Sequence, residues 1–174
     1  MTTLATSTLN DVDLAAVAAL AETVAGNEQA GDTTWSASVT WDGAFRSSAR
    51  IRDFAPLQSD EPAGLGGSNT APNPVEQLLA ALGNCLAVGY AANASARGIE
   101  LRDLRIDLSG DLDLHTFLGL RPGHAGFSNI TAEVHIASDA SREHLQELHS
   151  AVIATSPVGH TLAAAIPVSI DLAE

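Results

Sequence analysis

Residues 73–98, NPVEQLLAALGNCLAVGYAANASARG, constrain the fold more than any other stretch of this chain. Asn73 and Glu76 can form a capping box, with Pro74 between them at the first helical position. Gly98 suits the position that follows the last turn. No polar face develops until close to the C-terminal end. This pattern is typical of a helix buried nearly all round, so we expect a long central helix covered by other layers.

Small residues recur every four positions on this helix, at Gly83, Ala87 and Ala91. They form a smooth ridge against which a second helix can pack at the short end of the usual 8–10 Å range. A chain of 174 residues has few other long apolar helices. We therefore expect that the second helix can be the same helix of another subunit.

The segments before the central helix predict one helix and one hairpin. Asn10, with acidic residues just after it, predicts the cap of a helix that ends near Gly26. Alternating residues over 35–41 and 44–54, joined by turn residues, predict an antiparallel hairpin. The proline- and glycine-rich segment 55–73 predicts a loop without regular structure.

The segments after the central helix continue the same pattern. Strict alternation over 101–114 and 127–137 predicts two more strands. Ser141 predicts the cap of a helix that runs to about Thr155, and a short helix follows it. The segment PVSIDLA, 167–173, predicts a last strand.

Because the strands follow one another in pairs, the order of elements predicts an α+β fold with an antiparallel sheet wrapped around the buried central helix. A parallel doubly wound fold is disfavoured. We expect residues 1–30 to form a helical N-terminal extension and residues 31–174 to form one domain.

Charge and composition exclude several classes of partner. The formal net charge of −13 comes from 21 acidic and 8 basic residues. That balance disfavours nucleic acid and anionic lipid, since both bind through clustered basic side chains. The N-terminus has Asp11 and Asp13 where a secretory signal needs an apolar run, and the uncharged stretch 77–95 is interrupted by polar residues. We expect a cytoplasmic protein without a membrane span.

Cys85 is the only cysteine of the chain, which excludes an internal disulfide. A lone cysteine in an apolar helix is often a small packing residue. If its thiolate is to be the reactive form, a cationic side chain is the simplest partner. Arg46 is the candidate, with Arg50 and Arg52 on the same predicted strand. Glu76, nine residues earlier and about 13.5 Å along the helix axis, could act only through an intermediary.

No metal or cofactor site is predicted. The histidines never repeat at the spacing that puts two imidazoles on one helical face, and there is no second cysteine. No phosphate-binding glycine loop or nucleophile elbow is present. Surface or capping roles are expected for the histidines, which are His115, His124, His135, His144, His149 and His160.

Three stretches together resemble the OsmC/Ohr family of hydroperoxide-handling proteins. They are VTWDG, then GLGGSNTAPNPVEQLLAALGNCLA, then VIATSPVGHTLAAAIPVSI. The resemblance runs from about residue 34 to residue 172. It implies an OsmC-like domain over 31–174 and an intertwined homodimer, in which two central helices pack back to back inside the sheets.

The resemblance also implies a role for the thiol. Cys85 matches the family's peroxidatic cysteine, whose thiolate attacks a peroxide oxygen and becomes a sulfenic acid. Ser156 stands where the family has a second, resolving cysteine, so an external thiol would have to complete the cycle. Val75 stands where peroxidase members carry a glutamate, and Glu76 follows one place later. Ser156 also precedes Pro157, so it can cap the short helix that follows.

The sequence thus leads to an OsmC-like thiol protein of oxidative-stress defence that reduces organic hydroperoxides through Cys85, with Glu76 and Arg46 as weaker site candidates. The alternative is a dimer that binds a small apolar ligand beside Cys85 without catalysis. A third possibility is a dimeric scaffold with no ligand, in which large apolar side chains would pack tightly against the thiol.

Overall fold

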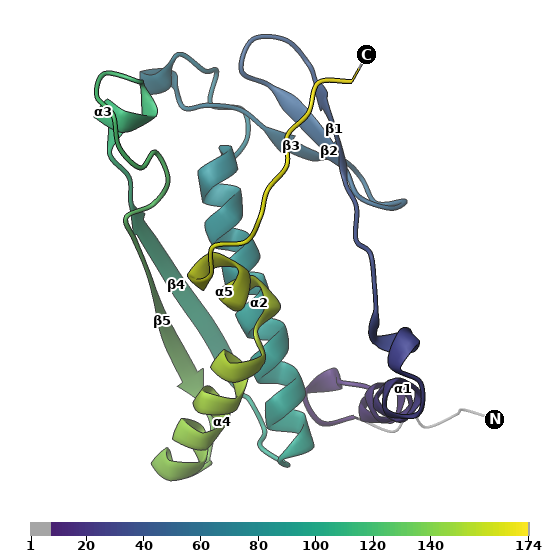
Figure 1. The fold of residues 1–174 in the computed structure, drawn as a ribbon. Helices are drawn as coiled ribbons and strands as arrows, with labels where there is room; N and C mark the ends of the chain where they lie inside the picture. Colours follow the sequence, from purple (N-terminus) through teal and green to yellow (C-terminus); the bar gives the residue numbers. More distant parts are fainter. Residues whose placement is uncertain (1–7, 174) are drawn as a thin grey trace, which may run out of the picture. The chain divides into compact units, whose positions relative to one another are not determined.

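The computed structural model describes residues 8–173. The chain forms two compact units. One is made of residues 15–80, and among the described residues the other joins 8–14 with 81–173. The long helix α2, Pro74–Ala96, begins in the first unit and continues into the second (Figure 1).

The first unit holds helix α1, Leu14–Gly26, and a three-stranded antiparallel sheet in the order β1-β2-β3. Strands β1, Ser38–Trp41, and β2, Ser47–Arg50, confirm the predicted hairpin. The third strand, β3, Leu57–Ser59, lies inside the segment that was predicted to lack regular structure. That prediction was wrong because the free edge of β2 supplies a backbone ladder for β3, in spite of the prolines and glycines around it.

Asn10 does not cap the N-terminal helix, which begins only at Leu14. Asn10 instead has a positive φ of 54° inside a short 3-10 turn. Its side-chain amide donates to the Ser95 hydroxyl and to the Ile99 carbonyl, at 3.0 and 2.9 Å, and its oxygen accepts from the backbone N–H of Leu101 at 2.8 Å. These bonds tie the N-terminal segment to the end of α2, so the predicted cap is a tertiary contact.

Both ends of α2 follow the sequence prediction. The Glu76 N–H donates to the Asn73 side chain at 2.9 Å, and the Asn73 N–H donates to the Glu76 carboxylate at 2.8 Å. This is the reciprocal pattern of a capping box. At the other end Gly98 has a φ of +69°, and the next N–H, from Ile99, reaches back to the Ala94 carbonyl.

The second unit packs α2 beside an antiparallel pair of strands (Figure 1). These are β4, Asp103–Asp111, and β5, Asn129–Ala137, which confirm the predicted pair. A short helix not predicted from the sequence, α3, Leu114–Phe117, lies between them. Helices α4, Arg142–Thr155, and α5, Pro157–Ala163, complete the unit. Its core consists of Leu82, Leu86, Tyr90, Ala94, Ile99, Leu148 and Val152.

Helix α2 is buried on one face of the single chain and not all round. Val88 is 70% exposed, and Leu78 also faces solvent. On the covered side, an added Cβ at Gly83 would stand 2.8 Å from Leu108 of β4, and one at Gly89 would stand 2.9 Å from Val152 of α4. Because Gly83 of the small-residue ridge has no side chain, strand β4 of the same chain packs closely against α2 at this position. By length and composition α2 could cross a membrane, yet its inner face forms the core of this unit.

Residues 167–173 form no strand within this chain, which corrects the sequence prediction. The alternation is real, but no neighbouring strand pairs with the segment. Its apolar residues stand in solvent: Val168 is 74% exposed, Ile170 90% and Leu172 100%. The fold class is nevertheless α+β with antiparallel sheets, as predicted.

Candidate active site around Cys85

Cys85 lies near the middle of α2 and is partly exposed. Its side chain lines a groove of about 370 Å³, within the ~300–1,000 Å³ typical of small-molecule sites. The walls come from α2 and from the junction between α4 and α5. The lining residues are Asn84, Cys85, Val88, Gly89, Ala92, Val152, Thr155, Ser156 and Pro157. The thiol is therefore open to a small molecule, and no large apolar side chain seals it.

Ser156 brings the second side chain to this site. It ends α4 and begins α5 in an extended conformation, and its hydroxyl accepts from the Gly159 N–H at 3.1 Å. Pro157 occupies the first position of α5, so the predicted cap is confirmed. The residue is only 5% exposed, so capping holds its hydroxyl in one place.

The Cys85 sulfur and the Ser156 hydroxyl oxygen are 3.3 Å apart. The hydroxyl already accepts a bond from the Gly159 N–H, and its own proton is free to point at the sulfur. A thiolate has no proton to give, so in that state Ser156 has to be the donor. The structure thus brings together the thiol and the residue in the place of the second cysteine, although the two are 71 positions apart in sequence.

The other two predicted site residues lie in the first unit. The Glu76 carboxylate is held by the capping box with Asn73. Arg46 precedes β2, where its backbone N–H and carbonyl close the turn of the hairpin with Gly43 and Asp42. A catalytic part for Glu76 or Arg46 stays a prediction.

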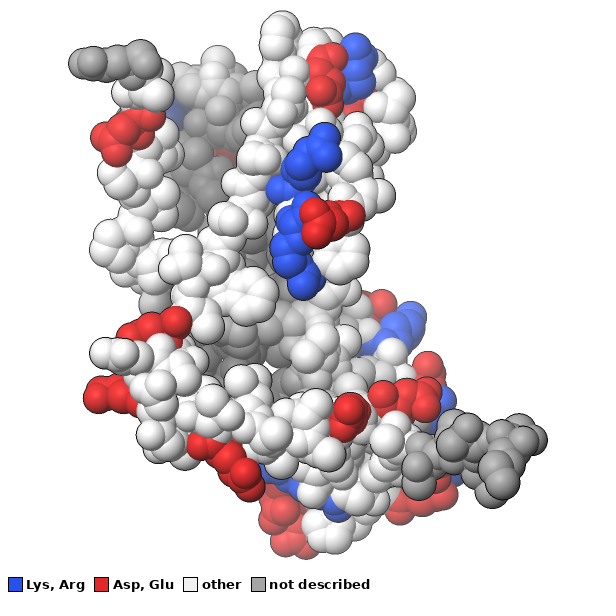
Figure 2. Space-filling model, turned by 90° about the vertical axis from the view of Figure 1, so that its right-hand side faces the viewer, with Lys and Arg blue, Asp and Glu red and all other residues white. Residues whose placement is uncertain are grey.

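The groove around Cys85 has no charged side chain among its described lining residues. Its surface is mostly aliphatic, with polar groups from Asn84, Thr155 and Ser156. On the face seen in Figure 2, acidic side chains are scattered and a group of arginine side chains stands near the centre. An uncharged molecule with an apolar body fits this lining better than an ionic one.

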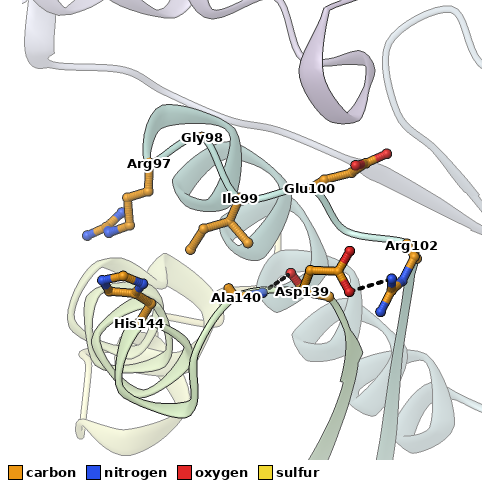
Figure 3. A pocket seen from close by; sticks show the side chains of 9 residues that line it. Arg97, Gly98, Ile99, Glu100, Arg102, Asp139, Ala140 and His144 are labelled. Atoms are coloured by element: carbon orange, nitrogen blue, oxygen red, sulfur yellow. Dashed lines mark hydrogen bonds and ion pairs between the residues drawn. The ribbon is translucent and has the colours of Figure 1, made fainter.

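A second cavity, of about 390 Å³, lies where α2 ends and α4 begins (Figure 3). Arg97, Arg102 and His144 border it. Arg102 pairs with Asp139 at 2.6 Å, and Arg97 donates to the Asn93 side chain at 2.9 Å. Since its arginines already have partners, this cavity offers a weaker site than the groove at Cys85.

The structure also joins groups that the sequence did not. Tyr90, the only tyrosine, hydrogen-bonds through its hydroxyl to Nδ1 of His149. Asp113 accepts bonds from His115, Thr116 and Arg121, and these bonds hold the pKa of its carboxyl far below the ordinary range. In the described part of the chain no three histidine, cysteine or acidic residues are grouped as metal ligands.

Comparisons with known proteins agree with the fold. A family model described as OsmC-like protein matches residues 66–171. An OsmC-like protein from Mycoplasma pneumoniae has a TM-score of 0.66 and 20% sequence identity, over 76% of this chain and 89% of that one. An organic hydroperoxide resistance protein OsmC from Legionella pneumophila has a TM-score of 0.58 and 18% identity, over 75% and 91%.

A third structure, an organic hydroperoxide resistance protein from Elizabethkingia anophelis, has a TM-score of 0.55 and 16% identity, over 75% of this chain and 89% of that one. At such identities these likenesses establish the fold alone. Sequence comparison with curated proteins gives no match.

Proposed function

The chain belongs to the OsmC-like protein family, whose model covers more than half of its 174 residues, and from that premise we propose that it serves peroxide defence as a thiol-dependent hydroperoxide reductase. Cys85 is the nucleophile of this proposal. The observation that supports it best is a partly exposed thiol in an apolar groove, 3.3 Å from a buried hydroxyl.

The chemistry balances with one hydroperoxide and two external thiols. The Cys85 thiolate attacks the terminal peroxide oxygen, the O–O bond breaks, and the alkoxide leaves and takes up a proton as an alcohol. The resulting sulfenic acid reacts with one external thiol to form a mixed disulfide and water. A second external thiol then releases the Cys85 thiolate and leaves as a disulfide.

Ser156 has a positioning part in this scheme. A serine hydroxyl cannot form a disulfide, so the cycle needs the external thiol that we include. The Ser156 hydroxyl can donate a hydrogen bond to the thiolate, because the Gly159 N–H fixes this hydroxyl beside the sulfur. The exchange of a resolving thiol for a hydroxyl would thus keep the nucleophile oriented while it changes the source of electrons.

Arg46 is the cation that we propose for the thiolate, and Glu76 is its proposed acidic partner. The test is to compare the rate of Cys85 alkylation in Arg46→Gln with that in Arg50→Gln, a matched change on the same hairpin. A slower rate in the first variant alone would support the role. Equal rates in both variants and in the unmodified protein would remove Arg46 from the site.

We further propose that the working form is a cytoplasmic homodimer. Apolar side chains are exposed on both α2 and α4, where Val88 is 70% and Ile153 52% exposed. The alternating C-terminal segment 167–173 adds a further exposed row. Burying such surfaces against a second copy is favourable at about 25 cal/mol per Å². Light scattering after size-exclusion chromatography should give twice the 17.9 kDa chain mass, and a monomer would contradict the proposal.

Hydroperoxide consumption tests the enzyme proposal directly. We expect cumene hydroperoxide to disappear in the presence of a dithiol at a rate that Cys85→Ser abolishes. A substoichiometric dose should leave a dimedone adduct on Cys85 that mass spectrometry detects. Catalysis is refuted if Cys85→Ser consumes hydroperoxide as fast as the unmodified protein in all three conditions, which are dithiol, monothiol and no reductant.

A non-catalytic binding function is the second candidate, and the aliphatic lining of the groove favours it. In that case an uncharged apolar ligand would protect Cys85 from alkylation without being consumed. The two functions separate in one experiment, because protection without turnover supports binding alone.

A further inference from the structure

A further groove, of about 350 Å³, is lined by residues of α2, β5 and α4 and belongs wholly to the second unit. Tyr90 is at its base and is only 1% exposed. The Tyr90 hydroxyl bonds to Nδ1 of His149, and the two rings lie nearly parallel with centroids 6.1 Å apart. His149 is itself exposed, so the pair connects the core to the open side of the groove.

Two regular elements form the walls. On α4, Arg142, Leu145, Gln146 and His149 follow the i, i+3, i+4, i+7 pattern of a single helical stripe. On β5, alternate residues of one face supply only apolar groups. These are Ala132, Val134 and Ile136. The groove is therefore apolar along the strand and has its one arginine, Arg142, at one end of the helical stripe, which suits a molecule with one charged end.

Arg142 gives that polar side its charge. Its guanidinium forms no ion pair or hydrogen bond within residues 8–173, whereas Arg102, Arg105 and Arg121 of the same unit pair with Asp139, Asp107 and Asp113. The free guanidinium can therefore bind an anion, and a planar carboxylate matches its fork of donors.

His149 adds a polar group to the groove, two helical turns from Arg142. Burial raises the pKa of Tyr90 above its ordinary value of 10.0, so the phenol keeps its proton at neutral pH. The hydroxyl and Nδ1 of His149 share a hydrogen bond, in which either atom can be the donor. Within the described residues no hydrogen bond engages Nε2. Nε2 is therefore open to a hydrogen bond from a ligand.

We propose that this groove is a binding site for a small monocarboxylate with an apolar body, held by Arg142 at its charged end and by β5 and Leu145 along its chain. The site is independent of the thiol function. Its volume is near the lower end of the range for small ligands, ~300–1,000 Å³, which suits a medium-length acid.

The single tyrosine gives a local probe. In protein labelled with 3-fluorotyrosine, only Tyr90 carries fluorine, so one ¹⁹F resonance reports on the base of the groove. We expect octanoate to shift that resonance in a saturable way and to bind more tightly than octanol, which has the same chain without the charge. Arg142→Gln should weaken octanoate by about tenfold or more, since it removes a charge-assisted contact, and leave octanol unchanged.

Arg105→Gln is the matched control, because it removes an arginine on β4 that does not line the groove. It should bind octanoate as the unmodified protein does. Ala132→Leu, which fills the apolar end, should abolish the shift while the circular dichroism spectrum stays unchanged. The proposal is overturned if octanoate gives no saturable shift, if octanol binds as tightly, or if Arg142→Gln and Arg105→Gln bind octanoate equally.

Discussion

Ser156→Cys should convert the contact at the proposed active site into a disulfide. The Cys85 sulfur and the Ser156 oxygen are 3.3 Å apart, while two bonded sulfurs are separated by about 2.05 Å. The side chains therefore have to approach by roughly 1.2 Å, and the groove leaves the Cys85 side free to adjust. A hydroperoxide supplies the oxidant, since a sulfenic acid on Cys85 condenses with a neighbouring thiol and releases water.

The expected change in stability follows from the length of the closed loop. The two positions are 71 apart, and closing a loop of that size removes about 15 cal/mol/K of chain entropy, or about 4 kcal/mol at 25 °C. The substitution also takes away the hydroxyl that caps α5, which costs about 1 kcal/mol. The reduced variant should thus be about 1 kcal/mol less stable than the unmodified protein, and the oxidised variant about 3 kcal/mol more stable.

Urea unfolding of both redox forms measures these differences, and mass spectrometry counts the thiols. Thr155→Cys is the control, because Thr155 lines the same groove but its hydroxyl donates to the Ala151 carbonyl and not to the sulfur. The reasoning fails if hydroperoxide leaves both thiols of Ser156→Cys free. It also fails if Thr155→Cys closes an intramolecular disulfide equally well.

Further substitutions test the fold. Leu148→Ala removes a fully buried side chain and should lower the free energy of unfolding by about 2–5 kcal/mol, whereas Leu118→Ala, at an exposed position, should change it little. Asn73→Ala should cost about 1 kcal/mol by breaking the capping box, and Glu76→Gln should cost less, because the amide oxygen still accepts; chemical denaturation checks both. Asp60 is 1% exposed; burial raises the pKa of its carboxyl, but bonds from Thr70, Glu61 and Ser68 outweigh this and lower it below its ordinary 3.8. Ionised Asp60 therefore stabilises the fold at pH values above the pKa that this carboxyl has in the unfolded chain. The stabilisation is lost as the pH falls through the lower pKa of the folded state. Asp60→Asn should accordingly flatten the loss of stability on acidification below about pH 4.

Local signals predicted the parts of the fold that depend on neighbours in sequence. The capping box at Asn73, the positive φ at Gly98 and the cap at Ser156 each involve residues within a few positions. Asn10 has the same local signal for a cap, yet its partners are Ser95, Ile99 and Leu101. The sequence pattern does not show whether a side chain bonds to a local or to a distant partner, and for this reason the prediction that Asn10 caps a helix was wrong.

The residues of the candidate site also divide into those with a signal in the sequence and those without one. The sequence indicated Cys85 because it is the only thiol, and its proximity to Ser156 followed from the family resemblance and not from the residues themselves. The bond between Tyr90 and His149 spans 59 positions and had no signal beyond one tyrosine in an apolar helix. The alternation over 167–173 was read correctly as a pattern, but a strand also needs a partner strand, which one chain does not supply.

The two grooves should work independently because of the geometry of α2. Cys85 and Tyr90 are five positions apart, which on an α-helix is about 140° around the axis. Cys85 therefore faces the junction of α4 and α5, while Tyr90 faces His149 and β5. No residue lines both grooves. Cys85→Ser should accordingly leave octanoate binding unchanged, and Arg142→Gln should leave hydroperoxide consumption unchanged. A loss of either activity through the other substitution would show that α2 couples the two sites.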